Sequence, residues 1–422
     1  MSRTRMSGIY SRTWYDDTCV SPSEQSTQQI QNKNFEFCII GGGLAGLSCA
    51  YHLAKMGASV VLLEKSAIGA GASGRNGGFC SAGWAANTSQ INRMIGKNNC
   101  IEFEELGLEG LSWMRQRAFS PEYSKAEAVN GVISLGLTKN LPEKSKIITQ
   151  KNLEQFVRGP RYRWGIIDKS AFHFHPLNFL RIFAGEVKKI GVKIIDNVGD
   201  VQIDTANVRT SSGTDFRCNR IIWATGGYGL ESNSVLKNLV LPIQTFICVT
   251  SPMGDILDEY IPTNMALGDD RRAGNYFRRL SDGRLLWGMG VSAMRQKSSQ
   301  QIRLMGWKNI KAHFPNMVQD MEKDRIVIDY AWSGLMAYAS HFLPVVGQIS
   351  DRELTLCGFG GHGMNTAPIV GKKMAMFLNG NLKSLDLFSI IPKRKTYGLL
   401  GRLAAEIEYR RLSFLDMVNE RY

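Results

Sequence analysis

The sequence predicts an α/β protein with more than one domain, and three observations lead to this prediction. First, residues 38–63 follow the order of a βαβ unit: an apolar strand, a glycine-rich turn, a helix and a second apolar strand. Second, later segments alternate as strands do and are punctuated by Gly and Pro, which indicates further strands joined by turns. Third, 422 residues exceed the length at which one hydrophobic core stops growing, so two domains are expected.

The turn in the βαβ unit has the glycine spacing of a Rossmann-type dinucleotide site. Gly41 permits the tight turn, Gly43 lets backbone N–H groups approach a pyrophosphate, and Gly46 lets the helix pack closely on the strand. Leu44 and Ala45 begin the helix, whose N-terminus favours negative charge. The turn alone does not choose between NAD and FAD.

An acidic residue stands where a ribose would be bound. Glu64, followed by Lys65, ends the second strand about twenty residues after the turn. Such a carboxylate accepts hydrogen bonds from ribose hydroxyl groups and would repel a 2′-phosphate. We therefore expect both residues to contact the cofactor.

Further glycine-rich segments supply the other candidate cofactor contacts. One is the loop at residues 69–78, another ends the strand at residues 221–224, and a third lies between a strand at residues 354–357 and a helix. Val201, in a short strand at residues 201–203, is a further candidate. A strand that ends in a turn of small residues suits a sheet edge that faces a ligand. The candidates are Gly71, Ala72, Ser73, Arg75, Asn76, Gly77, Gly78, Ala224, Thr225, Gly226, Gly361, His362, Gly363, Met364 and Asn365.

Composition limits the function classes. The formal charge of +14 is high, but the basic residues are spread along the chain, so a nucleic-acid partner is not favoured. No run of eighteen apolar residues predicts a membrane span, and the first thirty residues contain no apolar signal segment. Eight cysteines without a C-x-x-C pair indicate neither a disulfide framework nor a metal site. We expect reduced thiols in a cytoplasmic protein.

Taken together, these segments resemble the FAD-dependent amine oxidoreductases of the D-amino-acid oxidase superfamily, within it the γ-glutamylputrescine oxidase branch. The most specific match is the Gly-Ala-Ser-Gly-Arg-Asn-Gly-Gly loop at residues 71–78. The other matching blocks are residues 39–46, 175–178, 224–226 and 360–363, with a weaker one at 332–334 and 343–347.

The resemblance implies a discontinuous FAD-binding domain and a substrate domain whose mixed or antiparallel sheet covers the flavin ring. The expected division is an N-terminal arm at 1–34, an FAD-binding domain at 35–90, 160–229 and 340–390, a substrate domain at 91–159 and 230–339, and a tail at 391–422. The tail has the pattern of a basic amphipathic helix, which we expect to pack on its own protein rather than on a membrane.

The implied reaction is hydride transfer from the carbon beside an amine nitrogen to flavin N5, giving an imine that hydrolyses. The substrate would be a small amine or amino acid, and the acceptor would be oxygen or another compound. Sarcosine-type relatives attach FAD through a cysteine near residues 332–336, where this chain has none, so we expect non-covalent FAD. Asn365 stands where those relatives place a carboxylate-binding lysine, and Leu286 or Trp287 stands near their oxygen-activating lysine.

The expected substrate-facing residues border the ring. They are Arg279, Trp332, Tyr338, His341 and His362. Two other functions stay open at this point. One is oxidation of a modified nucleic-acid base, suggested by the charge, and the other is a flavin-bearing subunit without its own turnover.

Overall fold

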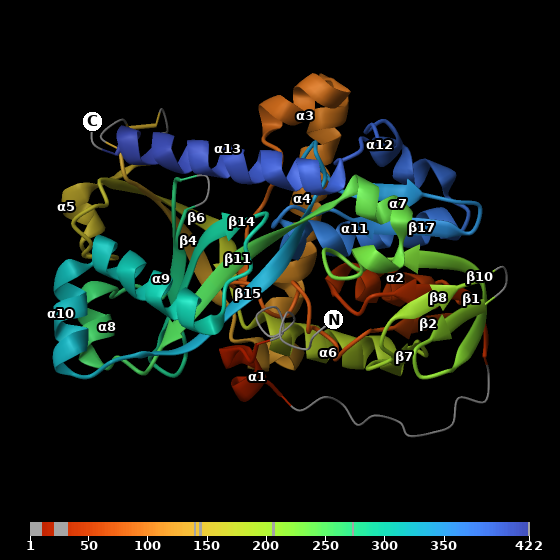
Figure 1. The fold of residues 1–422 in the computed structure, drawn as a ribbon, viewed down its shortest axis with the longest axis horizontal. Helices are drawn as coiled ribbons and strands as arrows, with labels where there is room; N and C mark the ends of the chain where they lie inside the picture. The colour runs from red at the N-terminus through yellow and green to blue at the C-terminus, as the bar shows by residue number, and fades with distance from the viewer. Residues whose placement is uncertain are drawn as a thin grey trace.

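The computed structural model describes residues 11–20, 33–138, 141–142, 146–204, 207–271 and 274–420. Two sheets lie side by side, with helices over their outer faces and one long helix across the top (Figure 1). Most of the expected N-terminal arm, residues 1–10 and 21–32, lies outside the described residues, as do the last two residues of the tail.

The first sheet is largely parallel. Its central strands run β17, β10, β1, β2 and β7, each parallel to the next, with β16 added antiparallel at one edge. β2 and the carboxyl-terminal three residues of β1 and of β10 are apolar and buried, as expected of strands covered on both faces. The strands are β1 (Asn34–Ile40), β2 (Val60–Leu63), β7 (Lys193–Ile195), β8 (Val201–Ile203), β9 (Asn207–Thr210), β10 (Asp215–Trp223), β16 (Val345–Gln348) and β17 (Glu353–Cys357).

Helices cover the first sheet and enclose the larger of its two cores. α2 (Leu44–Lys55) is expected from the sequence, and α11 (Gly363–Leu378) packs directly on it. Gly371 makes this close approach possible, because a Cβ atom there would lie 2.8 Å from the Ala45 carbonyl oxygen. Beside them lie α3 (Thr88–Ile95), α4 (Lys97–Ala118), α6 (Pro176–Lys189), α7 (Ser234–Leu239) and α12 (Asp386–Ser389).

The second sheet is antiparallel except where β12 runs parallel to β4. It follows the order β15, β11, β14, β13, β12, β4, β6 and β3, with β5 paired to β6. The strands are β3 (Phe79–Cys80), β4 (Val129–Gly136), β5 (Ile148–Thr149), β6 (Trp164–His173), β11 (Leu241–Thr250), β12 (Ala266–Asp269), β13 (Tyr276–Arg279), β14 (Leu285–Ser292) and β15 (Ile328–Tyr338).

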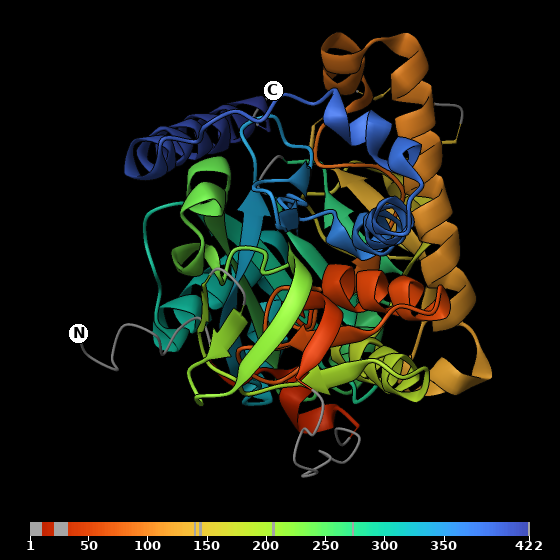
Figure 2. The same cartoon turned by 90° about the vertical axis from the view of Figure 1, so that its right-hand side faces the viewer.

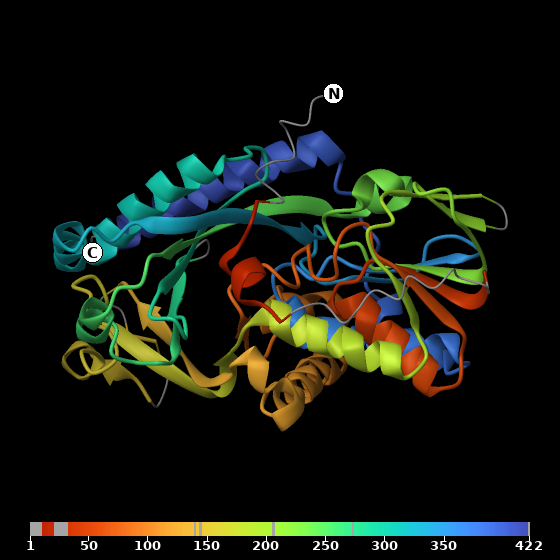
Figure 3. The ribbon, with the colours of Figure 1, turned by 90° about the horizontal axis from the view of Figure 1, so that it is seen from below.

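A separate hydrophobic core lies between this sheet and its helices, with Trp287 and Phe277 stacked at its centre. The helices on this side are α5 (Gln150–Leu153), α8 (Asp255–Tyr260), α9 (Ser299–His313), α10 (Pro315–Lys323) and α13 (Gly398–Asn419). Figure 3 shows α9 and α13 along the outer side of the long strands β11 and β15.

Two segments contact elements that the expected division places in the other domain. β6 belongs to the second sheet although it lies in residues 160–229, because its residues pair with β4 over most of its length. α4 packs against α11 although it lies in residues 91–159, because small residues on its inner face admit that helix. Neither long-range pairing has a local sequence pattern.

The N-terminal helix α1 (Trp14–Thr18) is wedged between the two halves. Trp14 and Tyr15 are buried in a small core with Leu177 of α6 and Trp332 of β15. Trp14 Nε1 also donates a hydrogen bond to Asp282 in the β13–β14 turn, at 2.8 Å. This segment therefore ties the second sheet to a helix of the first.

Candidate functional site

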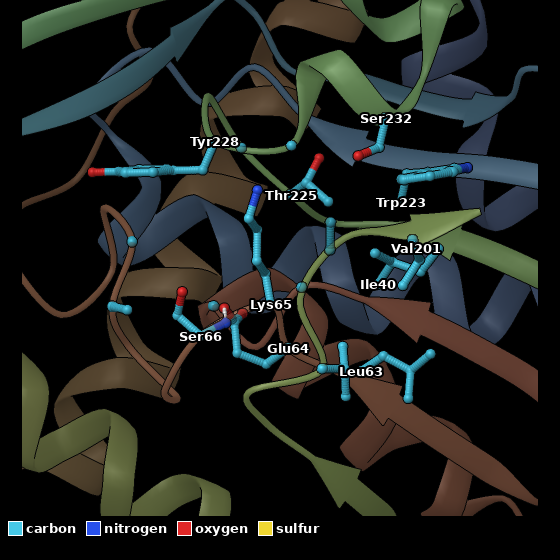
Figure 4. Close-up of a pocket in the computed structure, with 18 of the residues that line it drawn as sticks. Ile40, Leu63, Glu64, Lys65, Ser66, Val201, Trp223, Thr225, Tyr228 and Ser232 are labelled. Atoms are coloured by element: carbon cyan, nitrogen blue, oxygen red, sulfur yellow. Dashed lines mark hydrogen bonds between the residues drawn. The ribbon is translucent and has the colours of Figure 1, made fainter. Parts of the chain in front are cut away.

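The first of two adjoining pockets lies at the carboxyl ends of β1, β2 and β10. Ile40, Leu63 and Trp223, the last residues of these strands, all line it. Figure 4 shows the strand ends converging on one hollow, with the Lys65 side chain reaching into it. Ligands of open parallel sheets bind outside the carboxyl ends of the strands.

Glycine is required at the β1–α2 turn. Gly41 has φ +117°, and a Cβ atom there would lie 2.5 Å from the Ala224 carbonyl oxygen. At Gly46 a Cβ atom would lie 2.1 Å from the Gly41 carbonyl oxygen. Gly43 is the N-cap of α2 and provides no side-chain cap, although Ser73 Oγ accepts a hydrogen bond from the Leu44 N–H at 3.0 Å. The first turn of α2 thus faces the pocket and suits a phosphate group.

Glu64 lines the same pocket and also supports the turn. Its carboxylate accepts hydrogen bonds from the Gly42 N–H at 2.6 Å and the Ser66 N–H at 2.9 Å. Burial raises its pKa, although these two hydrogen bonds act in the opposite direction. Lys65 Nζ pairs with Asp200 at 2.6 Å, across the opening of the pocket.

The second pocket continues from the first and opens between the two sheets. Five residues line both pockets: Gly43, Ala72, Ser73, Ala224 and Gly226. Its walls come from the loop at residues 72–77, from β15 at residues 334–337 and from the start of α11 at residues 361–365. A long ligand held at the α2 N-terminus would therefore extend toward the second sheet.

The loop at residues 71–78 is held by its own polar side chains. Asn76 Nδ2 donates to the carbonyl oxygens of Ala72 and Ser73, both at 2.9 Å, and its Oδ1 accepts from the Gly78 N–H at 2.7 Å. Arg75 is buried and lines the second pocket. Its terminal nitrogens donate to Ala70 O at 3.2 Å and Ser11 O at 2.6 Å, while its buried Nε has no hydrogen-bond partner among the described residues.

The N-terminus of α11 forms the far end of the second pocket. Its N-cap residue His362 makes no side-chain cap, and residues 361–365 all line the pocket. Burial lowers the pKa of His362, which keeps the ring neutral near pH 7. The Asn365 side chain turns away from the pocket, since its Nδ2 donates to Gly83 O at 3.0 Å and Gly107 O at 3.4 Å.

Most of the predicted cofactor residues come together around these pockets. Gly46 and Gly78 lie outside the linings, where each makes room for backbone: a Cβ atom at Gly78 would lie 2.1 Å from the Phe174 carbonyl oxygen. The others line one pocket or both: Gly41, Gly43, Leu44, Ala45, Glu64, Lys65, Gly71, Ala72, Ser73, Arg75, Asn76, Gly77, Val201, Ala224, Thr225, Gly226, Gly361, His362, Gly363, Met364 and Asn365.

Most of the predicted substrate-facing residues do not line the second pocket. Of the five, only His362 lines the second pocket. Trp332 and Tyr338 lie on β15 at either end of the lining residues Gly334 and Met336, with which they share a face of the strand. A Cβ atom at Gly361 would lie 3.4 Å from Tyr338 Oη, so this tyrosine stands just behind the wall.

Arg279 and His341 lie away from the lining. Arg279 forms an ion pair with Asp258 and donates to Ile261 O at 3.3 Å. Its neighbours Tyr276 and Arg278 face the pocket loop instead, because alternate residues of a strand point to opposite faces. His341 Nδ1 accepts from the Leu343 N–H at 3.2 Å, and burial lowers its pKa to about 4, as expected of a structural residue.

Several lining residues were not predicted. Tyr276, Phe79, Met336 and Phe359 give the second pocket an apolar, aromatic wall, and Tyr228 and Ser232 line the first. The alternation of β13 would have indicated Tyr276 once Arg278 was placed. Phe79 and Met336 reach the pocket through long-range strand pairing, which no local pattern marks, whereas Tyr228 and Phe359 stand close to the predicted glycines Gly226 and Gly361.

The geometry fits a dinucleotide that spans both pockets, because the N-terminus of α2 lies where the pockets meet and the N-terminus of α11 lies at the far end of the second pocket. A family model described as FAD-dependent oxidoreductase matches residues 36–376. The chain belongs to this family. FAD is therefore the cofactor of the oxidoreductase, and non-covalent binding is typical of the family. Among the residues that line the two pockets there is no cysteine.

Individual relatives agree with this assignment. The oxidoreductase is 26% identical to the probable oxidoreductase OrdL of Haemophilus influenzae, over 92% of this chain and 93% of that one. It is 27% identical to gamma-glutamylputrescine oxidoreductase of Escherichia coli, over 85% and 86% of the two chains. Glycine oxidase from Bacillus cereus has the same fold, with a TM-score of 0.65 and 19% identity over 85% of this chain and 99% of that one.

Two further features concern the whole described chain. No helix among the described residues is both long and apolar enough to cross a bilayer. The described residues also contain no group of three or more His, Cys, Asp or Glu side chains that could hold a metal ion.

Proposed function

We propose that this oxidoreductase oxidises the C–N bond of a small amine. When bound, FAD supplies the acceptor for a hydride from the carbon beside the amine nitrogen, and the resulting imine is hydrolysed by water. The observation that supports the proposal most directly is the second pocket, which lies between the FAD-binding loop and the second sheet. Relatives named gamma-glutamylputrescine oxidoreductase and glycine oxidase act on compounds with such a bond.

We assign the cofactor contacts by position in the two pockets. The α2 N-terminus at Gly43 would hold the pyrophosphate, since its first turn is open to the pocket and its dipole favours negative charge. Glu64 would accept hydrogen bonds from the ribose. Residues 72–77 would lie along the ribityl chain, and the α11 N-terminus would face the pyrimidine end of the ring.

We further propose that the substrate has no carboxylate on the reacting carbon. A carboxylate in a protein pocket is commonly held by two parallel hydrogen bonds from an arginine. Among the described residues that line the second pocket, Arg75 is the one Lys or Arg, and its guanidinium is held toward the backbone because one N–H of each terminal nitrogen donates to a backbone oxygen. Asn365 does not replace it, because its amide donates to Gly83 and Gly107. An amine with an apolar or aromatic neighbour suits the wall of Tyr276, Phe79 and Met336.

The chain's own residues would orient the amine and exclude water rather than transfer a proton. His362 is the only imidazole in the lining of the second pocket, and burial lowers its pKa, so it is neutral near pH 7. We expect the amine to react in its neutral form. The free thiols of all eight cysteines agree with a reducing compartment, and we propose the cytoplasm.

An anaerobic screen tests the proposal. The purified protein, saturated with FAD, is mixed with primary and secondary amines and with the amino acid that carries a carboxylate on the reacting carbon of each amine. Bleaching of the flavin absorbance near its visible maximum reports reduction. We expect bleaching by amines and slower bleaching by the matched amino acids; no bleaching by any amine or amino acid would contradict the function, and faster bleaching by amino acids would contradict the substrate class. Admission of air then measures whether oxygen is the acceptor.

A further inference from the structure

Two hydroxyl groups stand on the wall that the second sheet gives to the second pocket. Thr245 of β11 and Tyr276 of β13 both line this pocket, and their side chains are hydrogen-bonded to each other. Figure 2 looks past the first sheet, which carries the cofactor end of the site, toward the second sheet behind it. Among the described residues, the others that the strands of this sheet give to the lining have no N–H or O–H group in a side chain: Phe79, Gly334, Leu335, Met336 and Ala337. The hydroxyl pair is therefore the polar side-chain feature of this wall.

The ring of Tyr276 is held in place because two glycines make room for it. Gly288 is the partner of Tyr276 on the neighbouring strand β14, and a Cβ atom there would lie 1.9 Å from Tyr276 Cζ. On the side of the cofactor loop, a Cβ atom at Gly77 would lie 2.5 Å from Tyr276 Cε2. Phe79 meets the ring edge to face, with 5.5 Å between the ring centroids. The ring thus passes over β14 and brings its hydroxyl group to Thr245 on the strand beyond.

The hydrogen bonds of this pair fix which way each proton points. Thr245 Oγ1 donates to the Gly290 carbonyl oxygen at 3.3 Å. A hydroxyl group has one proton and two lone pairs, so Thr245 bonds Tyr276 as the acceptor, and the Tyr276 hydroxyl group is the donor. Burial raises the pKa of Tyr276, so its proton stays on the phenol. The Tyr276 oxygen is then left with lone pairs alone, and toward the pocket it can accept a hydrogen bond but not donate one.

An oxygen that only accepts hydrogen bonds selects a ligand group that donates them. A neutral primary or secondary amine has an N–H to donate, whereas a neutral tertiary amine has none. We propose that Tyr276 accepts a hydrogen bond from the N–H of the substrate amine, so that the enzyme oxidises primary and secondary amines and discriminates against tertiary ones. This inference rests on the proposed function and narrows its substrate class.

The same hydrogen bond becomes stronger as the amine reacts. When the hydride leaves the carbon with its electron pair, the nitrogen lone pair closes the C=N bond and the N–H group becomes part of a cation. Hydrogen bonds from charged donors are about twice as strong as those between neutral groups. An interaction that strengthens in the transition state accelerates the chemical step instead of only tightening binding. Tyr276 therefore acts on the rate of flavin reduction as well as on amine affinity, and it keeps its own proton throughout.

Stopped-flow reduction of the full-length, FAD-loaded protein tests the inference. The amine that bleaches the flavin fastest in the anaerobic screen is compared as its primary, N-methyl and N,N-dimethyl forms, at equal concentrations of unprotonated amine. We expect the N,N-dimethyl form to react at least about tenfold more slowly than the N-methyl form. Tyr276→Phe keeps the ring and removes the hydroxyl group. It should lower the limiting rate for the primary and N-methyl forms by about 10- to 100-fold and leave the N,N-dimethyl rate nearly unchanged.

Tyr123→Phe is the matched control, because it removes a hydroxyl group that bonds Glu186 at 2.8 Å outside both pocket linings. Its rates should equal those of the unmodified protein. The ratio of the N-methyl to the N,N-dimethyl rate is measured on one preparation, so a partly unfolded or unloaded sample does not alter it. Equal rates for the two forms in the unmodified protein, or an unchanged ratio in Tyr276→Phe, would overturn the inference and leave amine oxidation in place. No bleaching by any amine would instead contradict the proposed function, and the inference with it.

Discussion

Trp332 Nε1 donates a hydrogen bond to the carbonyl oxygen of Arg75 at 2.9 Å, and so joins the second sheet to the loop that borders the cofactor site. Both groups are buried, and Trp332 is fully so. The bond places β15 over the loop at residues 72–77. The two halves of the molecule meet at the site through this contact.

Removal of that bond should weaken both the fold and FAD binding. Trp332→Phe leaves the Arg75 carbonyl oxygen buried without its partner, which should cost about 1–3 kcal/mol of the free energy of unfolding. Trp287→Phe is the control, because Trp287 is equally buried but its indole N–H has no partner among the described residues. Urea unfolding and FAD titration of both variants measure the difference. Equal losses in the two variants would show that the hydrogen bond contributes nothing.

Arg75 should set the reduction potential of the bound flavin. Among the described residues it is the one Lys or Arg in the lining of the second pocket, so its charge should stabilise a reduced, anionic flavin. Arg75→Met should lower the midpoint potential on the order of tens of millivolts, and Arg75→Lys should lower it less. A spectroelectrochemical titration at full FAD saturation measures this. An unchanged midpoint potential in Arg75→Met would show that the Arg75 charge does not stabilise the reduced flavin.

The β1–α2 turn should not tolerate a side chain at Gly46. Gly46→Ala would place a methyl group 2.1 Å from the Gly41 carbonyl oxygen, so the turn must open and FAD should be lost. Gly185→Ala in α6 has no atom within 4 Å of the new methyl group and should stabilise the protein by up to about 1 kcal/mol. Flavin content after purification and the thermal midpoint compare the two. FAD retention by Gly46→Ala would contradict the tight packing of the turn.

Acid should destabilise the protein between about pH 6.5 and pH 4. Burial lowers the pKa of all six histidines, to about 3 for His173 and His175. The unfolded chain therefore binds more protons than the folded one in this range, and stability falls as pH falls. His175 cannot accept a proton on Nδ1 without losing the Asn178 N–H bond that begins α6.

The variant His175→Asn tests this linkage, because Asn also caps helices but does not titrate. The number of protons taken up on unfolding, which sets the slope of the unfolding free energy against pH, should be lower by up to about one than in the unmodified protein. Urea unfolding at closely spaced pH values measures the slope. A slope that stays the same would mean that His175 is not protonated on unfolding in this range.

Local chemistry explains which parts of the site could be predicted from the sequence. Gly41 and Gly46 could be predicted because the backbone geometry of the turn requires glycine at both positions, and the loop at 71–78 has a distinctive composition. The prediction includes Arg279 and omits Tyr276, because a strand's register relative to the loop is not encoded locally and a shift of one residue reverses its face. The packing of α4 on α11 and the pairing of β6 with β4 depend on contacts far apart in the chain, which composition and periodicity do not reveal.

The short helix α1 is easily mistaken for a dispensable leader. Thr18 Oγ1 lies 3.1 Å from His175 Nε2, and the Val20 N–H donates to Asn178 at 2.7 Å, while Trp14 donates to Asp282 in the β13–β14 turn of the second sheet. A recombinant protein trimmed to begin at the first strand would lose these contacts between α6 and the second sheet. Expression trials should therefore keep every residue from Ser11 onward.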